Sequence, residues 1–324
     1  MRKVIVRKIG DPKVLELVSS EGTRPSPGEV LVDVEAAGIN FIDVYQRQGH
    51  IAVPTPFTPG YEGVGTVREV GKDISTLKPG SRVAWINVLG SYADQVVIPA
   101  VQAIAIPRAF GIEQSLLFQA ITAQYLLTEY RSIRPGDVVL VHSAAGGVGQ
   151  ILTQWLKHLG AVVIGTASTE EKLQTIRALG ADHAVNYADG HFLEPVLDLT
   201  RGRGVDLAFD AVGATTFSST VKALATRGTA ISYGRASGSA PDVAMLPLLL
   251  KGARVAGGSL FTYVSDPKEM QIRAAAAIQG IQEGWFRLGK ATTYALTDVA
   301  AAHQALESRA TQGKLALIVG KNPA

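Results

Sequence analysis

The amino-acid sequence predicts an α/β protein made of a β-rich domain and a domain with a doubly wound parallel sheet. Short β-branched runs separated by Pro-Gly turns fill about the first 115 residues. From residue 138 onward, strand-like and helix-like segments alternate, which is typical of a parallel sheet covered by helices on both faces. The length of 324 residues agrees with two domains of about 150 residues each.

The N-terminal strands are marked by runs rich in β-branched residues at 30–34, 64–67 and 82–86. Pro-Gly pairs, which favour tight turns, lie close to these runs at 27–28, 59–60 and 79–80. Short strands at regular spacing predict a barrel or a sandwich for this part of the chain.

The pattern changes near Gly111. Apolar residues at helical spacing predict one helix over residues 113–130, and the uninterrupted apolar run at 138–141 predicts a strand buried on both faces. Further helices are expected at 149–159, 169–179, 193–199, 217–224 and 298–309, and further strands at 162–164, 184–185, 205–209, 229–233 and 315–319. We therefore expect the parallel-sheet domain at 119–260, inserted into a β-rich domain formed by 1–118 and 261–324.

Composition and charge exclude several classes of function. The net charge is +3, and no run of five like charges marks a nucleic-acid arm or a membrane-binding tract. The chain has no cysteine, which excludes disulfides, cysteine–zinc sites and thiol nucleophiles. No apolar run approaches the roughly 18 residues of a membrane span, and the N-terminus lacks the apolar segment of a signal peptide. We expect a cytoplasmic protein with no membrane or nucleic-acid partner.

A glycine-rich loop is the sharpest motif, and residues 139–149 read VLVHSAAGGVG. Gly146 and Gly149 fit a G-x-G-x-x-G frame whose first position is Ala144. Small residues are needed there because a pyrophosphate approaches the backbone closely and binds the N–H groups at the helix start. Strand, loop, helix and second strand follow in order within about 30 residues, which favours dinucleotide binding over a plain tight turn.

The end of the second strand indicates which dinucleotide binds. NAD-binding proteins usually place an acid there to hold the ribose 2′-hydroxyl, and such an acid repels a 2′-phosphate. Residues 165–172 read GTASTEEK, so both glutamates fall inside the next helix and Lys172 is one turn in, within reach of a phosphate. Alternatively, Ser168 and Glu171 form a capping box and Lys172 is solvated. The missing acid favours NADPH over NADH.

Four segments of the chain resemble the medium-chain dehydrogenase/reductase superfamily, and within it the quinone oxidoreductases related to ζ-crystallin. They are AGINFIDVY at 37–45, PGYEGVG at 59–65, AAGGVG at 144–149 and ESRATQGK at 307–314. The resemblance covers essentially the whole chain. It implies that the β-rich domain is GroES-like and that the parallel-sheet domain is a Rossmann domain.

The resemblance also bears on zinc. Zinc-dependent relatives bind the catalytic metal through a cysteine near the position of Asn40 and a histidine near that of Tyr61. Neither ligand is present, and the histidines at 50, 142, 158, 183, 191 and 303 show no ligand spacing. We expect no metal. His142 ends a buried strand and is interpreted as a structural residue with satisfied hydrogen bonds.

Candidate site residues are carried over from the same resemblance. Those near the nicotinamide, the catalytic candidates, are Asn40, Asp43 and Tyr45. Those expected to hold the cofactor are Thr122, Ala145, Gly146, Gly147, Val148, Ser168, Lys172, Tyr187, Tyr233, Ser237 and Arg309. Plainer interpretations stay open: Tyr45 as a packing aromatic, Asp43 as a loop or cap residue, and Arg309 and Lys314 as surface residues.

These observations predict NADPH-dependent reduction of quinones or similarly activated carbonyl compounds. The cofactor supplies hydride, and without zinc no Lewis acid polarises an unactivated ketone, so the acceptor must already be electrophilic. Tyr45, or a water held by Asn40 and Asp43, could donate the proton. Two-electron hydride transfer and one-electron semiquinone chemistry are both consistent with the residues.

Two alternative functions and one oligomeric state are also consistent with the sequence. The first alternative is an enoyl- or 2-alkenal-type double-bond reductase on the same scaffold, and the second is a crystallin-like or RNA-binding role without catalysis. No basic patch with interleaved aromatic residues supports RNA binding. A homodimer is expected through an edge strand and the leucines of residues 246–260, unless 246–250 is a helix packed inside its own subunit.

Overall fold

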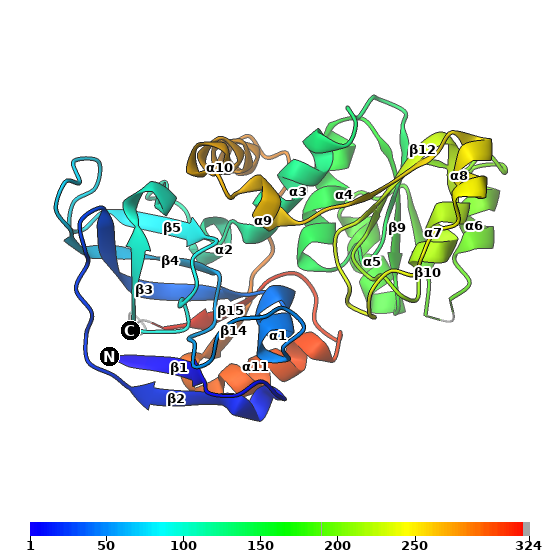
Figure 1. Cartoon of the computed structure of the whole chain (residues 1–324). Coiled ribbons are helices and arrows are strands. Elements are labelled where there is room, and N and C mark those ends of the chain that lie inside the picture. Colours follow the sequence, from blue (N-terminus) through cyan, green and yellow to red (C-terminus); the bar gives the residue numbers. More distant parts are fainter. Residues whose placement is uncertain (189, 320–324) are drawn as a thin grey trace. The chain divides into compact units, whose positions relative to one another are not determined.

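The computed structural model describes residues 1–188 and 190–319 of the chain. Its contacts divide the protein into two compact units (Figure 1). Unit 1 comprises Met1–Phe118, Tyr263–Ile278 and Leu288–Ala324, and unit 2 comprises Gln119–Thr262 and Gln279–Arg287. Among the described residues, none of the helices has the length and apolar character that crossing a membrane requires.

Unit 1 is built on a seven-stranded sheet in the order β14-β15-β3-β4-β5-β7, with β6 paired to β3. Its strands are β3 (Glu29–Ile39), β4 (Glu62–Val70), β5 (Arg82–Ile86), β6 (Gln95–Pro99), β7 (Ile104–Ala105), β14 (Thr292–Ala295) and β15 (Leu315–Ile318). A separate hairpin pairs β1 (Arg2–Val6) with β2 (Leu15–Ser19). Valine dominates the core, because β-branched side chains pack well on a pleated sheet.

Helix α1 (Phe41–Arg47) follows β3 directly, in a part of the chain where the sequence pattern predicted strands. The carboxylate of Asp43 accepts a hydrogen bond from the Asn40 N–H at 2.9 Å and so closes the first turn. Helix α11 (Val299–Glu307) lies against α1. The described residues also include the single-turn 3-10 helices η1 (Pro12–Val14), η2 (Ala100–Gln102) and η3 (Leu296–Asp298).

The single helix predicted over residues 113–130 is wrong, because the structure has α2 (Ile112–Ser115) and α3 (Phe118–Glu129). Leu116 leaves the helical conformation with ψ of 95°, and Leu116 and Leu117 are both buried. The Phe118 N–H then donates to Glu62 Oε1 at 2.7 Å. A hydrogen bond to a distant strand therefore separates the two helices, and no local pattern could reveal it.

Unit 2 contains a six-stranded parallel sheet in the order β10-β9-β8-β11-β12-β13 (Figure 1). Its strands are β8 (Val138–Val141), β9 (Val162–Ala167), β10 (His183–Asn186), β11 (Val205–Asp210), β12 (Leu224–Ser232) and β13 (Arg254–Gly257). The strand order reverses between β8 and β11, which creates the switch point where such sheets bind ligands beyond their carboxyl ends. The predicted doubly wound sheet is confirmed.

Helices alternate with these strands. They are α4 (Gly147–His158), α5 (Glu170–Ala178), α6 (Leu193–Leu199), α7 (Phe217–Lys222) and α8 (Met245–Lys251), followed by α9 (Leu260–Tyr263) and α10 (Pro267–Gln282). The strand predicted at 229–233 begins earlier, at Leu224, because Leu224 pairs with Val205 across an irregular register. That pairing also ends α7 two residues before the predicted position.

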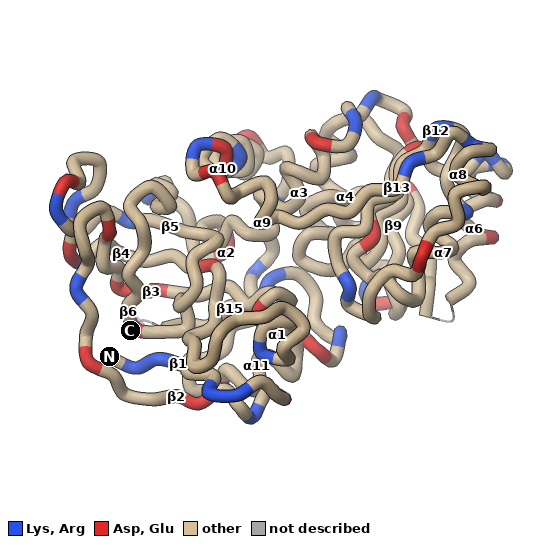
Figure 2. The backbone as a smooth tube through the Cα atoms, viewed as in Figure 1, with Lys and Arg blue, Asp and Glu red and all other residues tan. Residues whose placement is uncertain are grey.

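Strand β13 forms one edge of the sheet in unit 2, because it pairs with β12 alone among the described strands, and helix α8 precedes it in the chain. Leu248 is buried, whereas Met245, Leu246, Leu249 and Leu250 are 64–75% exposed. The interpretation that 246–250 packs wholly inside its own subunit is therefore wrong. Lys251 ends α8 and Arg254 begins β13, and both carry positive charge. Figure 2 shows Lys and Arg residues of the chain in blue.

Candidate active site

The loop after β8 ends in an uncapped helix N-terminus. Helix α4 begins at Gly147, and its extended N-cap residue Gly146 offers no side chain to the helix N–H groups. The first N–H groups of a helix have no partner within it, so an anionic group can bind them. The structure thus brings Ala145, Gly146, Gly147 and Val148 together at this N-terminus.

Close packing explains why the loop needs glycine. A Cβ atom at Gly149 would lie 2.4 Å from Ser143 O and 2.7 Å from Ala144 Cα. A Cβ atom at Gly147 would lie 2.1 Å from Nε2 of Gln119. Glycine therefore lets the start of α4 lie close to the loop after β8 and to Gln119 of α3, so the residues present fit the pyrophosphate of a dinucleotide.

A buried hydrogen-bond network lies beneath this loop. His142 Nδ1 contacts Thr166 Oγ1 at 2.8 Å, and Nε2 contacts Thr220 Oγ1 at 2.9 Å. Thr220 in turn donates to Asp210 Oδ2 at 2.8 Å. Burial lowers the pKa of His142 and keeps the ring neutral. The network ties the ends of β8, β9 and β11 together, which confirms that both ring nitrogens of His142 are satisfied.

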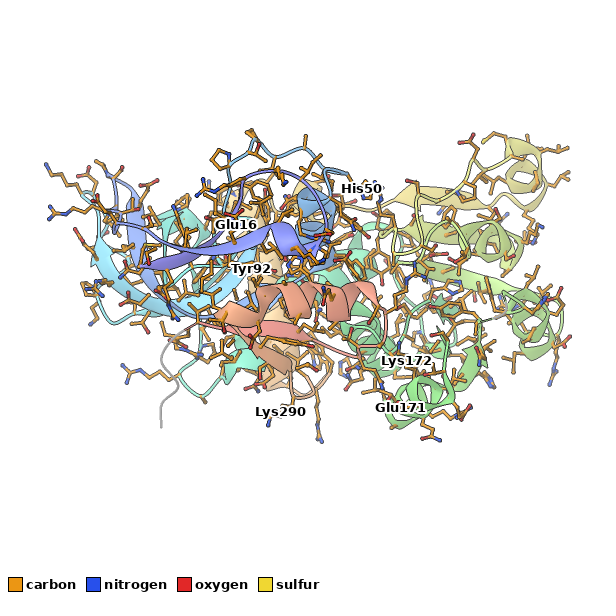
Figure 3. The ribbon with its side chains drawn as sticks, turned by 90° about the horizontal axis from the view of Figure 1, so that it is seen from below. Glu16, His50, Tyr92, Glu171, Lys172 and Lys290 are labelled. Carbon is orange, nitrogen blue, oxygen red and sulfur yellow. The ribbon has the colours of Figure 1, made fainter. Side chains whose placement is uncertain are left out.

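The turn after β9 differs from the predicted capping box, in which Ser168 was the cap. Thr169 is the N-cap residue of α5, and its hydroxyl accepts from the Lys172 N–H at 3.3 Å. Ser168 lies one residue earlier because β9 ends at Ala167. As predicted, no acid stands at the strand end, and Glu170 and Glu171 lie in the first turn of α5. Lys172 projects beside Glu171 (Figure 3), and partial burial lowers its pKa.

Tyr187, Tyr233 and Ser237 follow the carboxyl ends of β10 and β12, at the sheet edge that carries the glycine loop. The Ser237 hydroxyl donates to Val212 O at 2.7 Å and so joins the loops after β12 and β11. Burial raises the pKa of Tyr233. Thr122 is buried in α3.

Arg309 belongs to unit 1, where it follows α11 with a left-handed φ of 56°. The other residues expected to hold the cofactor all belong to unit 2.

A buried charged cluster surrounds Asn40 in unit 1. Asn40 Nδ2 donates to Glu62 Oε2 at 3.0 Å, and Lys314 Nζ donates to Asn40 Oδ1 at 3.3 Å. Lys314 also forms an ion pair with Glu62. Glu62 is fully buried and Lys314 is 8% exposed, so the interpretation of Lys314 as a surface residue is wrong.

Asp43 is fully buried beside this cluster. Its Oδ2 accepts from the Tyr92 hydroxyl at 3.1 Å, and that hydroxyl lies 3.2 Å from His303 Nε2. Burial raises the pKa of Asp43 to about 7, although the Asn40 N–H, the Tyr92 hydroxyl and the Lys314 charge act in the opposite direction. Burial, together with the charge of Arg47, lowers the pKa of His303 to about 3. Asp43 thus serves as a helix cap and also titrates near neutral pH.

Tyr45 lies in α1, where its ring packs against Phe41 with centroids 5.9 Å apart. The following turn of α1 is anchored by Arg47, which is fully buried, pairs with Glu307 of α11 and donates to Gly10 O at 3.1 Å. These contacts fix the helix that carries Asp43 and Tyr45.

The sequence alone indicated no role for Glu62, Tyr92 or His303. Glu62 stands inside the PGYEGVG segment, and an acid in an apolar strand was an available signal of a buried partner. Lys314 is 252 residues away in the chain, so the pairing itself carried no sequence signal. Gly38 leaves space for the ion pair of Glu62 and Lys314, because a Cβ atom at this position would lie 1.9 Å from Glu62 Oε2.

No group of three or more histidine, aspartate or glutamate side chains is placed to hold a metal ion within residues 1–188 and 190–319. The ammonium of Lys314 instead occupies the surroundings of Asn40. The residues around Asn40 therefore do not fit a zinc ion, since a fixed positive charge repels a cation.

Together, the folds of both units and the glycine loop define the class of dinucleotide-binding oxidoreductases with a GroES-like domain. Residues 26–108 match the family model described as "Alcohol dehydrogenase GroES-like domain", and residues 147–277 match the one described as "Zinc-binding dehydrogenase".

Similar proteins indicate which family within this class of oxidoreductases the chain belongs to. Quinone oxidoreductase 1 of Escherichia coli strain K12 is 35% identical over 98% of this chain and 99% of its own. The 2-haloacrylate reductase of a Burkholderia species is 34% identical over 97% of this chain and 98% of its own. The crystal structure of Escherichia coli quinone oxidoreductase complexed with NADPH has a TM-score of 0.93 and 35% identity, covering 98% of this chain and all of that one. The chain belongs to the quinone oxidoreductase family of medium-chain dehydrogenases/reductases.

Proposed function

We propose that this protein is an NADPH-dependent reductase of quinones or similarly activated carbonyl compounds. The observation that carries the proposal is the uncapped N-terminus of α4 at the switch point, combined with a β9 end that has no acid and is followed by Lys172. The first feature suits a pyrophosphate, and the second suits a 2′-phosphate. The Escherichia coli relative complexed with NADPH supports the same cofactor.

The cofactor assignment is tested by titrating NADPH and NADH by fluorescence. Tight NADPH binding and weak NADH binding are expected. Lys172→Ala should weaken NADPH roughly tenfold, as expected for a lost phosphate contact of about 1.4 kcal/mol, and leave NADH unchanged. Lys157→Ala, which removes a lysine paired with Asp182 elsewhere in unit 2, is the matched control. Equal affinities of the native chain for both cofactors would overturn the assignment.

We also propose that the reaction needs no zinc. Asn40 stands near the position where zinc-dependent relatives place a cysteine ligand, and the Lys314 ammonium supplies positive charge beside it. When bound, NADPH supplies the hydride. Because the reaction is proposed to proceed without zinc, a chelator should leave turnover unchanged. Stoichiometric zinc, with activity lost to the chelator, would contradict this.

Without a Lewis acid, the acceptor must already be electrophilic, which favours quinones and α,β-unsaturated carbonyl compounds. Tyr45, or a water held by Asn40 and Asp43, is proposed to donate the proton. The pKa of Asp43, raised to about 7, allows that carboxyl to hold a proton near neutral pH.

A second candidate is reduction of a carbon–carbon double bond, and the similarity to a 2-haloacrylate reductase favours it. NADPH consumption with a panel of o-quinones, p-quinones and enones separates the candidates. Turnover of quinones supports the first, and turnover of enones alone supports the second. Consumption with neither would favour a role without catalysis.

We further propose a homodimer through α8 and β13. Each subunit is proposed to have the expected domains, 1–118 with 261–324, and 119–260. The four exposed apolar side chains of α8 and the unpaired edge of β13 support it. Leu249→Asp should give a monomer by light scattering, whereas Leu199→Asp on α6, also partly exposed, should not. A monomeric native chain at micromolar concentration would refute the interface. The cytoplasmic location stays a prediction.

A further inference from the structure

An unusual ion pair lies in the core of unit 1. Glu62 is fully buried and its partner Lys314 is 8% exposed, although the two residues are 252 positions apart in the chain. Removing two charges from water costs more than their attraction usually returns. The pair therefore calls for an explanation beyond stability, and its contacts with a candidate catalytic residue provide one.

Both charged groups contact the same side-chain amide. Asn40 Nδ2 donates to Glu62 Oε2 at 3.0 Å, while Asn40 Oδ1 accepts from Lys314 Nζ at 3.3 Å. A carboxylate can only accept and an ammonium can only donate, so the two together dictate which end of the amide is oxygen and which is nitrogen. The Phe118 N–H, at 2.7 Å, occupies the other oxygen of Glu62 and fixes the carboxylate.

The same contacts change the amide's strength as a donor. The Lys314 ammonium donates to the carbonyl oxygen and draws electron density away from the amide nitrogen, so the N–H group that Glu62 does not take becomes a stronger donor. An Asn side chain has two N–H groups, and Glu62 takes one of them. Asn40 is 6% exposed, and its remaining N–H group has no partner among the described hydrogen bonds.

We propose that Glu62 and Lys314 are positioning residues that hold the Asn40 amide with its remaining N–H as a hydrogen-bond donor to the hydride acceptor's oxygen. The proposal rests on the proposed reductase function. As hydride arrives, negative charge grows on that oxygen, and a donor fixed in advance stabilises it without reorganisation. A proton then reaches the oxygen from a separate donor, so Asn40 gives a hydrogen bond and no proton.

The kinetic test is a double-mutant cycle between Asn40→Ala and Lys314→Gln. Each single change should lower kcat roughly 100-fold or more with little change in KM, because loss of one oxyanion donor costs about 10²–10³ in kcat. Lys314→Gln on top of Asn40→Ala should lower kcat less than threefold further, because the amide it positions is gone. Equal effects of Lys314→Gln with and without Asn40→Ala would overturn the proposal.

Two further variants guard against loss of folding. Lys314→Gln leaves Glu62 without its cation, so Glu62→Gln with Lys314→Gln removes both charges and keeps groups that can hydrogen-bond. This double variant should show a cooperative thermal unfolding transition, as a folded protein does, and should still have the lower kcat. A kcat equal to that of the native chain would overturn the proposal. Lys290→Gln, an exposed lysine of unit 1 (Figure 3), is the matched control and should behave like the native chain.

A second readout does not depend on turnover. The chain has four asparagines, so selective ¹⁵N-asparagine labelling gives four side-chain amide signals, and Asn40→Ala assigns the one required. The Asn40 protons should exchange slowly with water and differ widely in chemical shift, and Lys314→Gln should remove both features. Fast exchange in the native chain would overturn the proposal. If the native chain reduces no quinone or enone, the proposed function fails, and this measurement still decides the orientation of Asn40.

Discussion

Replacing Asp43 by asparagine should change how the stability of the protein depends on pH. Burial raises the pKa of Asp43 to about 7, whereas an aspartate in the unfolded chain has a pKa of about 3.9. The native state therefore keeps this proton over a pH range in which the unfolded chain has released it. By linkage, stability falls as pH rises from about 4 and levels off above about 7. Asparagine preserves the size of the side chain and an oxygen that can accept from Asn40 N–H and Tyr92.

The expected size follows from the two pKa values. Between pH 5 and pH 8, ionisation of Asp43 should lower the native chain's free energy of unfolding by about 2.5 kcal/mol relative to Asp43→Asn. Urea unfolding of both proteins at the two pH values measures this difference, and other titrating groups cancel in the comparison. A difference between the proteins that stays constant within about 0.5 kcal/mol from pH 5 to pH 8 would refute the reasoning.

Three further predictions follow from the same structure. The pKa of His303 is lowered to about 3, so protonation of the unfolded chain should lower the native chain's free energy of unfolding by about 3 kcal/mol between pH 7 and pH 4. His303→Gln should lack this decrease, and an equally large decrease in the variant would contradict the prediction. Gly149→Ala should weaken NADPH binding roughly 100-fold in a fluorescence titration, since its Cβ would meet backbone atoms at 2.4 and 2.7 Å, whereas Gly289→Ala, with open space around it, should bind normally. Val255→Pro should convert a dimer to a monomer by removing a backbone donor from β13, and an unchanged dimer by light scattering would count against that edge.

Much of the fold could be predicted from the sequence because its signals are local. The apolar run at 138–141 became β8, and the helix expected at 193–199 became α6 with the same bounds. The break between α2 and α3 could not be predicted, because it depends on the bond from the Phe118 N–H to Glu62 in another strand. Helical spacing of apolar residues continues across a tertiary interruption of this kind.

The candidate site was predictable to a similar degree. The glycine loop and the missing acid after β9 are contiguous in sequence, so their chemistry could be interpreted directly. The helix cap at Thr169 was misplaced by one residue, because serine and threonine are both good caps and the choice depends on where β9 ends. The cluster of Asn40, Glu62 and Lys314 joins three distant segments, and only the folded chain brings them together.

The most direct test of the central claim is a single-turnover reaction of metal-depleted protein. Protein freed of metal by chelation is mixed without oxygen with one equivalent each of NADPH and a p-quinone, and the absorbance of NADPH is followed. The proposed function predicts that one NADPH is consumed for each quinone reduced, at a rate that added zinc does not change. No loss of NADPH, or loss only after zinc is added, would contradict it.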